Sequence, residues 1–83
     1  MTFNGRKLKE LRQLFQMSSS DVAEMLQVDF HKASHFERGI ETPDFNQIQI
    51  LCREFHVKPM YFFTDSLLGE GIDPTALSIN HHA

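Results

Sequence analysis

The sequence is short of cysteine and of long apolar runs, which excludes several classes of protein. Its 83 residues include one cysteine, Cys52, so no internal disulfide can form. Because Cys52 lies in an apolar stretch of helical spacing, we expect a buried, reduced thiol, as is usual in the cytoplasm. No apolar run has the length of a signal peptide or a membrane-spanning helix. We therefore expect a cytoplasmic protein without membrane contact.

The sequence also lacks the alternation of apolar and polar residues that predicts β-strands, and it contains no internal repeats. Apolar residues instead recur every three or four positions, which predicts an all-α chain. Hydrophobic residues make up 41% of the sequence, and eight of them are phenylalanines. The chain can therefore form one small domain whose core needs no disulfide.

Basic residues are missing from one end of the chain. Residues 64–83 hold three acidic residues and no lysine or arginine, whereas residues 1–12 hold four basic residues and one acidic residue. Without the C-terminal segment, the remainder has eight acidic and eight basic residues, so the net charge of −3 belongs to that segment. An acidic chain of this kind can still have nucleic acid as its partner.

Local signals divide the N-terminal part of the chain into short helices. A first helix is expected over residues 5–16. Ser18, followed by Asp21 three positions later, is close to a capping box and starts a short second helix. Asp29 can cap a third helix, and Gly39 ends it because glycine readily adopts positive φ.

Two more helices are expected further along the chain. Asp44 can cap a fourth helix, and Pro59 is well placed as the first residue of a fifth. In that fifth helix, Met60, Phe62 and Phe63 are expected to close the core.

The helical periodicity fades near residue 65, where we place the end of the domain, 1–65. Glycines and a proline interrupt residues 66–83. We expect this acidic tail to be mobile, or else to associate with a second subunit or a protein partner.

Two short capped helices joined by a brief link form a helix-turn-helix, whose second helix can lie in the major groove of DNA. Further residues around this motif carry a family pattern, and they are Leu11-Arg12, Met17-Ser18, Val22-Ala23, Leu26, Val28, Phe36-Glu37-Arg38-Gly39, Pro43, Leu51-Cys52, Phe55 and Val57. Through them, residues 5–63 resemble the lambda-repressor-like (Xre/Cro) helix-turn-helix family. The resemblance implies a compact bundle of about five short helices. It also implies a repressor-like transcriptional regulator, bacterial or phage, that reads duplex DNA with its third helix.

The same resemblance implies a DNA-binding surface around the third helix. Its lysine suits a phosphate or a guanine edge, its histidines can donate to base acceptors, and a phenyl ring can pack on a thymine methyl. Phosphate contacts are also expected from the basic residues of 1–12. The alternative is that these polar side chains only solvate an exposed helix face. The implied DNA-binding residues are Ser18, Ser19, Phe30, His31, Lys32, Ser34, His35 and Arg38.

Some positions depart from the family pattern. Ser19 stands where members usually carry a glutamine, and Gln27 takes the place of a glycine at the turn. Phe30 stands where a polar base reader is common. The missing glutamine at Ser19, the presence of Phe30 and the acidic tail favour a rival interpretation, a protein-interaction or antitoxin-like module with weak or no DNA binding.

The resemblance further implies a structural ion pair between Arg12 and Glu37, which would fix the third helix. The alternative is two separate surface charges. We also expect a homodimer, because paired half-sites add phosphate contacts and buried area that one small domain lacks. The contact surface between the two subunits could be formed by apolar residues, or the same residues could pack within the domain; they are Ile50, Met60, Tyr61 and Phe62.

Catalysis is not expected from this sequence, because it contains no activated nucleophile and no phosphate-binding loop. His31 and His35 have the spacing of two metal ligands on a helix, but a third ligand is missing. We therefore expect no enzyme activity, no metal and no cofactor.

Overall fold

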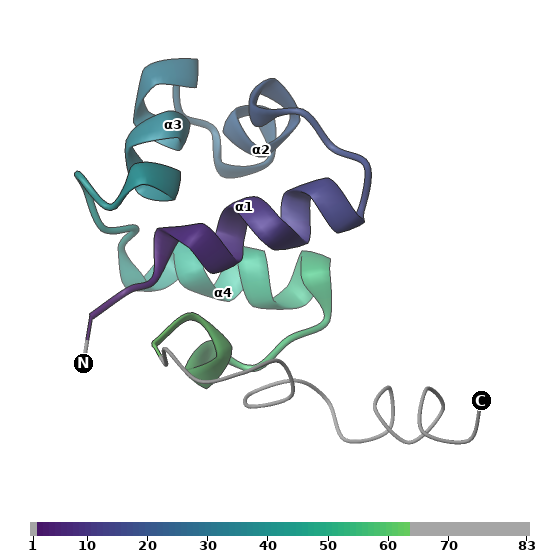
Figure 1. Ribbon diagram of the computed structural model, residues 1–83, viewed down its shortest axis with the longest axis vertical. Coiled ribbons are helices and arrows are strands. Elements are labelled where there is room, and N and C mark those ends of the chain that lie inside the picture. Colours follow the sequence, from purple (N-terminus) through teal and green to yellow (C-terminus); the bar gives the residue numbers. More distant parts are fainter. Residues whose placement is uncertain (1, 64–83) are drawn as a thin grey trace.

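The computed structural model describes residues 2–63, and each element in that range is a helix. In the view of Figure 1, α2 and α3 lie above α1, and α4 lies below it. The all-α fold expected from the sequence is confirmed. The elements are α1 (Gly5–Leu14), α2 (Ser19–Leu26), α3 (Phe30–Arg38), α4 (Phe45–Phe55) and a 3₁₀ helix η1 (Pro59–Phe63).

Side-chain caps start the helices where the sequence predicts them. The Ser18 amide donates to the Asp21 carboxylate at 2.7 Å, and the Asp21 amide donates to the Ser18 hydroxyl at 3.0 Å. At the start of α3, the Asp29 carboxylate accepts from the Lys32 amide at 2.8 Å. These bonds satisfy amide groups that have no partner within the helix.

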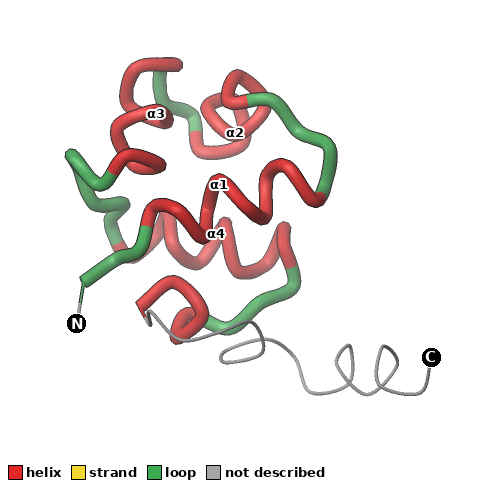
Figure 2. Tube along the Cα trace, in the orientation of Figure 1, coloured by secondary structure: helices red, strands yellow, loops and turns green. Residues whose placement is uncertain are grey.

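Left-handed residues end α2 and α3. Gln27 has φ of +57° and ψ of +44°, and Gly39 has φ of +76°. Gln27 therefore takes the turn position that glycine fills elsewhere, with the steric cost of its Cβ. The link to Asp29 is short, as Figure 2 shows, and it holds α2 and α3 in contact.

Buried apolar side chains from all five helices form one core. Phe36 of α3 and Phe62 of η1 are completely buried. Phe3, which precedes α1, stacks on Phe62 with ring centroids 5.4 Å apart, a contact that the sequence did not predict. The Asn4 amide donates to the Phe62 carbonyl at 2.6 Å, so both ends of the described chain are tied together.

Gly5 permits a close approach between α1 and the last turn of α3. A Cβ at this position would collide with the Phe36 carbonyl oxygen and would lie 2.6 Å from that of Glu37. Only glycine fits here without moving backbone atoms. The position of α3 thus depends directly on this residue.

Several expectations about the core were wrong. Helix α1 ends at Leu14 rather than at residue 16, because Gln16 has φ of +57°. Met60 is 58% exposed and does not close the core. Of the two alternatives left open for Tyr61 and Phe62, the structure shows packing within the domain, because both residues are buried. The reason is that η1 is a tight five-residue 3₁₀ turn, which buries the adjacent Tyr61 and Phe62 and leaves Met60 outside.

Two further expectations concern burial and the tail. Cys52 is half-buried rather than fully buried, and partial burial raises the pKa of its thiol. The predicted domain end at residue 65 and the predicted mobile or partner-associated tail, 66–83, lie outside the described residues.

Candidate nucleic-acid interface

Helix α3 has one buried face and one exposed face. Ala33 and Phe36 are completely buried against the other helices. Phe30, His31 and Lys32 are exposed on the first turn. The capping carboxylate of Asp29 precedes this turn and fixes where the helix begins, so these side chains project from a rigid element.

The second half of α3 adds fewer exposed groups. Ser34 and His35 are half-buried, and Arg38 is exposed on the last turn. At the start of α2, Ser18 is exposed but its hydroxyl oxygen already accepts from the Asp21 amide, and Ser19 is half-buried. Most of the predicted DNA-binding residues therefore lie along α3, whereas Ser18 and Ser19 form a separate group at the start of α2.

Arg12 and Glu37 join α1 to α3. Arg12 Nε donates to Glu37 Oε2 at 2.7 Å and Arg12 Nη2 donates to Glu37 Oε1 at 3.1 Å, which makes the pair bidentate. The side chains are 14% and 6% exposed, so they meet out of bulk water and do not face separate solvent. Arg12 Nη1 also donates to the Met17 carbonyl at 3.1 Å, which ties the start of α2 to the same guanidinium.

A loop carboxylate, Glu41, pairs with two of the α3 residues that were predicted to contact DNA. Its Oε2 lies 2.8 Å from His35 Nδ1 and its Oε1 lies 3.6 Å from Lys32 Nζ. The hydrogen bond from His35, followed by the charge of Lys32, lowers the pKa of the Glu41 carboxyl below its ordinary value. Glu41 was not predicted as a site residue, although an acidic residue shortly after a helix with basic residues was an available signal.

Lys7 contradicts the expectation that the basic residues of 1–12 all hold phosphates. It is only 6% exposed, and its Nζ has no hydrogen-bond partner. The ammonium lies 4.9 Å from the centroid of the Tyr61 ring, whose π face attracts it. Because the side chain runs between α1 and η1, Lys7 cannot reach a phosphate, whereas Arg6 and Lys9 remain exposed.

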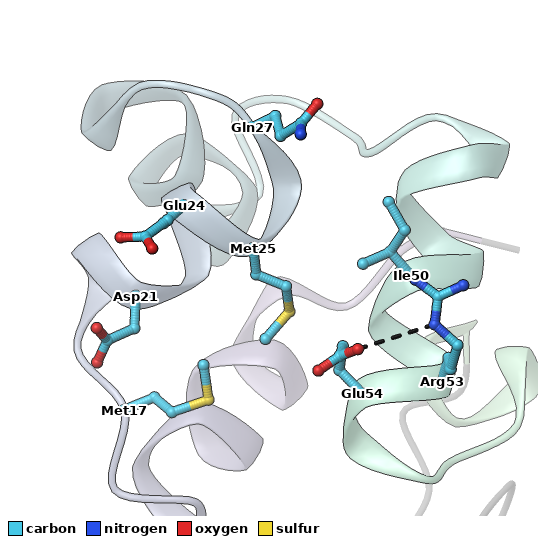
Figure 3. A pocket seen from close by; sticks show the side chains of 8 residues that line it. All are labelled: Met17, Asp21, Glu24, Met25, Gln27, Ile50, Arg53 and Glu54. Carbon is cyan, nitrogen blue, oxygen red and sulfur yellow. Dashed lines mark ion pairs between the residues drawn. The ribbon is translucent and has the colours of Figure 1, made fainter.

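Two hollows flank this arrangement. One, of about 450 Å³, lies between the start of α1 and the end of α3 and has both Arg6 and Arg38 in its lining. The other, which we call the α2–α4 groove, has a volume of about 620 Å³ and is shown in Figure 3. It is lined by Met17, Asp21, Glu24, Met25, Gln27, Ile50, Arg53 and Glu54.

The α2–α4 groove has a thioether and aliphatic lining with acidic residues around it. Three carboxylates line the groove and only one arginine, Arg53, whose Nε lies 3.8 Å from Glu54 Oε2 (Figure 3). A phosphate would be repelled here. The groove carries more acidic than basic side chains in its lining.

Clusters of metal ligands and membrane-spanning helices are both absent from residues 2–63. In that part of the chain, no group of three or more histidine, cysteine, aspartate or glutamate side chains is placed to hold a metal ion. None of its helices has both the length and the apolar character needed to cross a membrane.

The packing of α2, a three-residue link and α3 on the other helices is a helix-turn-helix fold. It is similar to the crystal structure of a transcriptional regulator from Listeria innocua, with a TM-score of 0.71 and 18% identity over the whole of this chain and 81% of that chain. In sequence, 63 residues are 27% identical to the uncharacterised HTH-type transcriptional regulator y4wC of Sinorhizobium fredii. That match covers 76% of this chain but only 44% of the relative. No protein-family model matches the chain.

Proposed function

We propose that this chain is a cytoplasmic transcriptional regulator that binds duplex DNA and reads the major groove with α3. The observation that carries the proposal is the exposed, polar first turn of α3 on a helix held by the buried Arg12–Glu37 pair. A recognition helix must keep a fixed angle to the rest of the domain to align its side chains with base edges. The names of the two similar proteins, both transcriptional regulators, support the same function.

Six residues of the interface, exposed or half-buried, have the following roles in this proposal. His31 and Ser34 contact base edges, Phe30 packs on a thymine methyl, and Arg38 binds a phosphate. Ser18 and Ser19 add phosphate contacts from the start of α2. The side chains on α3 are expected to supply most of the sequence preference, because base edges carry the information and phosphates do not.

The proposed regulator acts as a homodimer and a repressor. A single domain of this size makes few phosphate contacts, and a two-fold dimer doubles them on paired half-sites about one helical turn apart. Because Tyr61 and Phe62 are buried, the exposed Met60 and the half-buried Ile50 are left as candidates for the dimer surface. Bound at a promoter, such a dimer would block transcription.

Selection from a random duplex library tests sequence-specific binding directly. The bound fraction should converge on a motif with two related half-sites, and its affinity should fall steeply with salt. Recovery of unrelated sequences with the same affinity as the input library would contradict specific reading. A monomer in sedimentation velocity, both free and bound, would contradict the dimer.

The second candidate function is a protein-interaction module of the antitoxin-like kind, and the α2–α4 groove favours it. Methionine side chains adapt to irregular apolar partners, and three carboxylates favour a positively charged one. The occupant that fits is a basic amphipathic helix of a partner protein. Such a peptide should shift the methyl resonances of Met17 and Met25, and replacing Glu24 and Glu54 by glutamine should weaken the binding. If the peptide shifts neither methyl group, this candidate is excluded.

A further inference from the structure

The exposed face of α3 already holds an anion, and that anion is the side chain of Glu41. Lys32 and His35 are three residues apart, so they project from the same side of the helix. Their nitrogen atoms converge on the two oxygens of one carboxylate, at 3.6 Å from Lys32 Nζ and 2.8 Å from His35 Nδ1. Two adjacent oxygens of a DNA phosphate present a similar pair of acceptors to the same donors.

From this geometry we propose that Lys32 and His35 form a phosphate site, that Glu41 occupies it in the free protein, and that DNA must displace Glu41 to bind. The inference rests on the proposed DNA-binding function and deepens it. It assigns these two residues to the DNA backbone, and it makes Glu41 a positioning residue that competes with the ligand.

The contacts of Glu41 are of the kind that can be exchanged. All three side chains are partly exposed to solvent, between 37% and 46%. Ion pairs with this exposure are weak and are screened by salt, so a phosphate can replace the carboxylate without disturbing the fold. Glu41 lies in the segment between the end of α3 and Asp44, which belongs to no helix. The Glu41 amide donates to the His35 carbonyl at 3.3 Å, so the displacement needs only a rotation of the Glu41 side chain and no movement of the backbone.

The charge of Glu41 opposes DNA throughout the neutral pH range. Its pKa is lowered, chiefly by the hydrogen bond from His35, so the carboxyl group remains ionised. The Arg12–Glu37 pair is internally neutralised, and the Asp29 carboxylate accepts from the Lys32 amide at the helix start. Removing the Glu41 charge therefore leaves Lys32 as an unpaired cation on this face of α3.

The test compares two variants of the full chain that each lose one negative charge. Glu41→Gln removes the competing carboxylate, whereas Glu24→Gln removes an exposed carboxylate from the α2–α4 groove. Affinity for a random-sequence duplex is measured by fluorescence anisotropy at several salt concentrations. Glu41→Gln should raise the affinity roughly twofold to fivefold over the wild type, and Glu24→Gln should raise it less.

A combined variant separates competition from general charge. In a Lys32→Ala/His35→Gln background, the gain from Glu41→Gln should disappear, because the phosphate site is no longer present. Glu41→Asp, which keeps the negative charge, should have the affinity of the wild type. All variants should have a Tm within a few degrees of the wild type, because the side chains of Lys32, His35 and Glu41 are partly exposed.

The outcomes distinguish the inference from the function on which it rests. If the wild type binds DNA and Glu41→Gln gains no more than Glu24→Gln, the competition is refuted and the DNA-binding function stands. If the gain persists without Lys32 and His35, the phosphate site is refuted. If neither the wild type nor Glu41→Gln binds DNA at any salt concentration, both proposals fail. Binding by Glu41→Gln alone would support the competition and contradict DNA binding by the wild-type chain.

Discussion

Replacement of Arg12 by methionine should destabilise the domain more than any other single change of a charged residue among residues 2–63. The guanidinium makes two hydrogen bonds to Glu37, at 2.7 and 3.1 Å, and a third to the Met17 carbonyl at 3.1 Å. Methionine keeps the volume but leaves the Glu37 carboxylate, which is 6% exposed, without a cation. Loss of one partner of such a pair costs about 3–5 kcal/mol.

The loss is large enough to measure by thermal unfolding. For a domain of this size, 1 kcal/mol corresponds to about 4–8 °C in Tm, so a loss of 3 kcal/mol lowers Tm by about 12–24 °C. The matched control is Arg53→Met, because Arg53 is exposed and its nearest carboxylate oxygen, on Glu54, is 3.8 Å away. That variant should stay within about 0.5 kcal/mol of the wild type.

A double-mutant cycle identifies the cause of the loss. Glu37→Gln should lower the free energy of unfolding less than Arg12→Met does. Arg12 is the more exposed partner, so it keeps its hydrogen bond to the Met17 carbonyl and can also reach water. The double variant Arg12→Met/Glu37→Gln should lose less free energy of unfolding than the two single variants lose together, by at least about 1 kcal/mol. Additive losses, or a cost below about 1 kcal/mol for Arg12→Met, would refute the claim that this pair fixes α3.

Three other changes follow from local geometry. Gln27→Gly should stabilise the chain by about 0.5–1 kcal/mol in urea unfolding, since relief of a positive φ worth about 1–2 kcal/mol outweighs the added flexibility of glycine. Lys7→Met should raise stability by about 1 kcal/mol because it removes a buried ammonium without a hydrogen-bond partner, and the exposed Lys9→Met should change little. The hydrogen bond from the Ser18 amide lowers the pKa of the Asp21 carboxyl below its ordinary value of 3.8. The stability that the ionised Asp21 contributes is therefore present above that pH and is lost as the pH falls through the lower pKa of the folded state. Asp21→Asn should consequently flatten the decline of Tm below about pH 4.

The starts of α2, α3 and α4 and the end of α3 were predictable because their causes are local. Asp29 and Asp44 cap α3 and α4 through amides only three residues away, and Gly39 ends α3 within one turn. Information of this range is contained in a short window of sequence. The left-handed Gln27 was instead expected from the family resemblance, in which a glycine is usual at the turn.

The contacts between distant segments were harder to predict. Nothing near Lys7 in the sequence indicates that the Tyr61 ring covers its ammonium, because the two meet only when η1 packs on α1. Glu41 reaches back to His35 only because Gly39 reverses the chain after α3. The Arg12–Glu37 pair was expected from the family resemblance, and no local pattern would have shown it.

The central claim is that α3 contacts the DNA, and a matched pair of lysine variants tests it most directly. Lys32 is exposed on α3, whereas Lys58 is exposed in the link between α4 and η1. Each is replaced by alanine in the full chain, and the affinity for a random duplex is measured by anisotropy across a salt series. We expect Lys32→Ala to weaken binding and to reduce the salt slope by about 1, while Lys58→Ala changes neither. Equal effects of the two variants, or no effect of Lys32→Ala, would contradict the account.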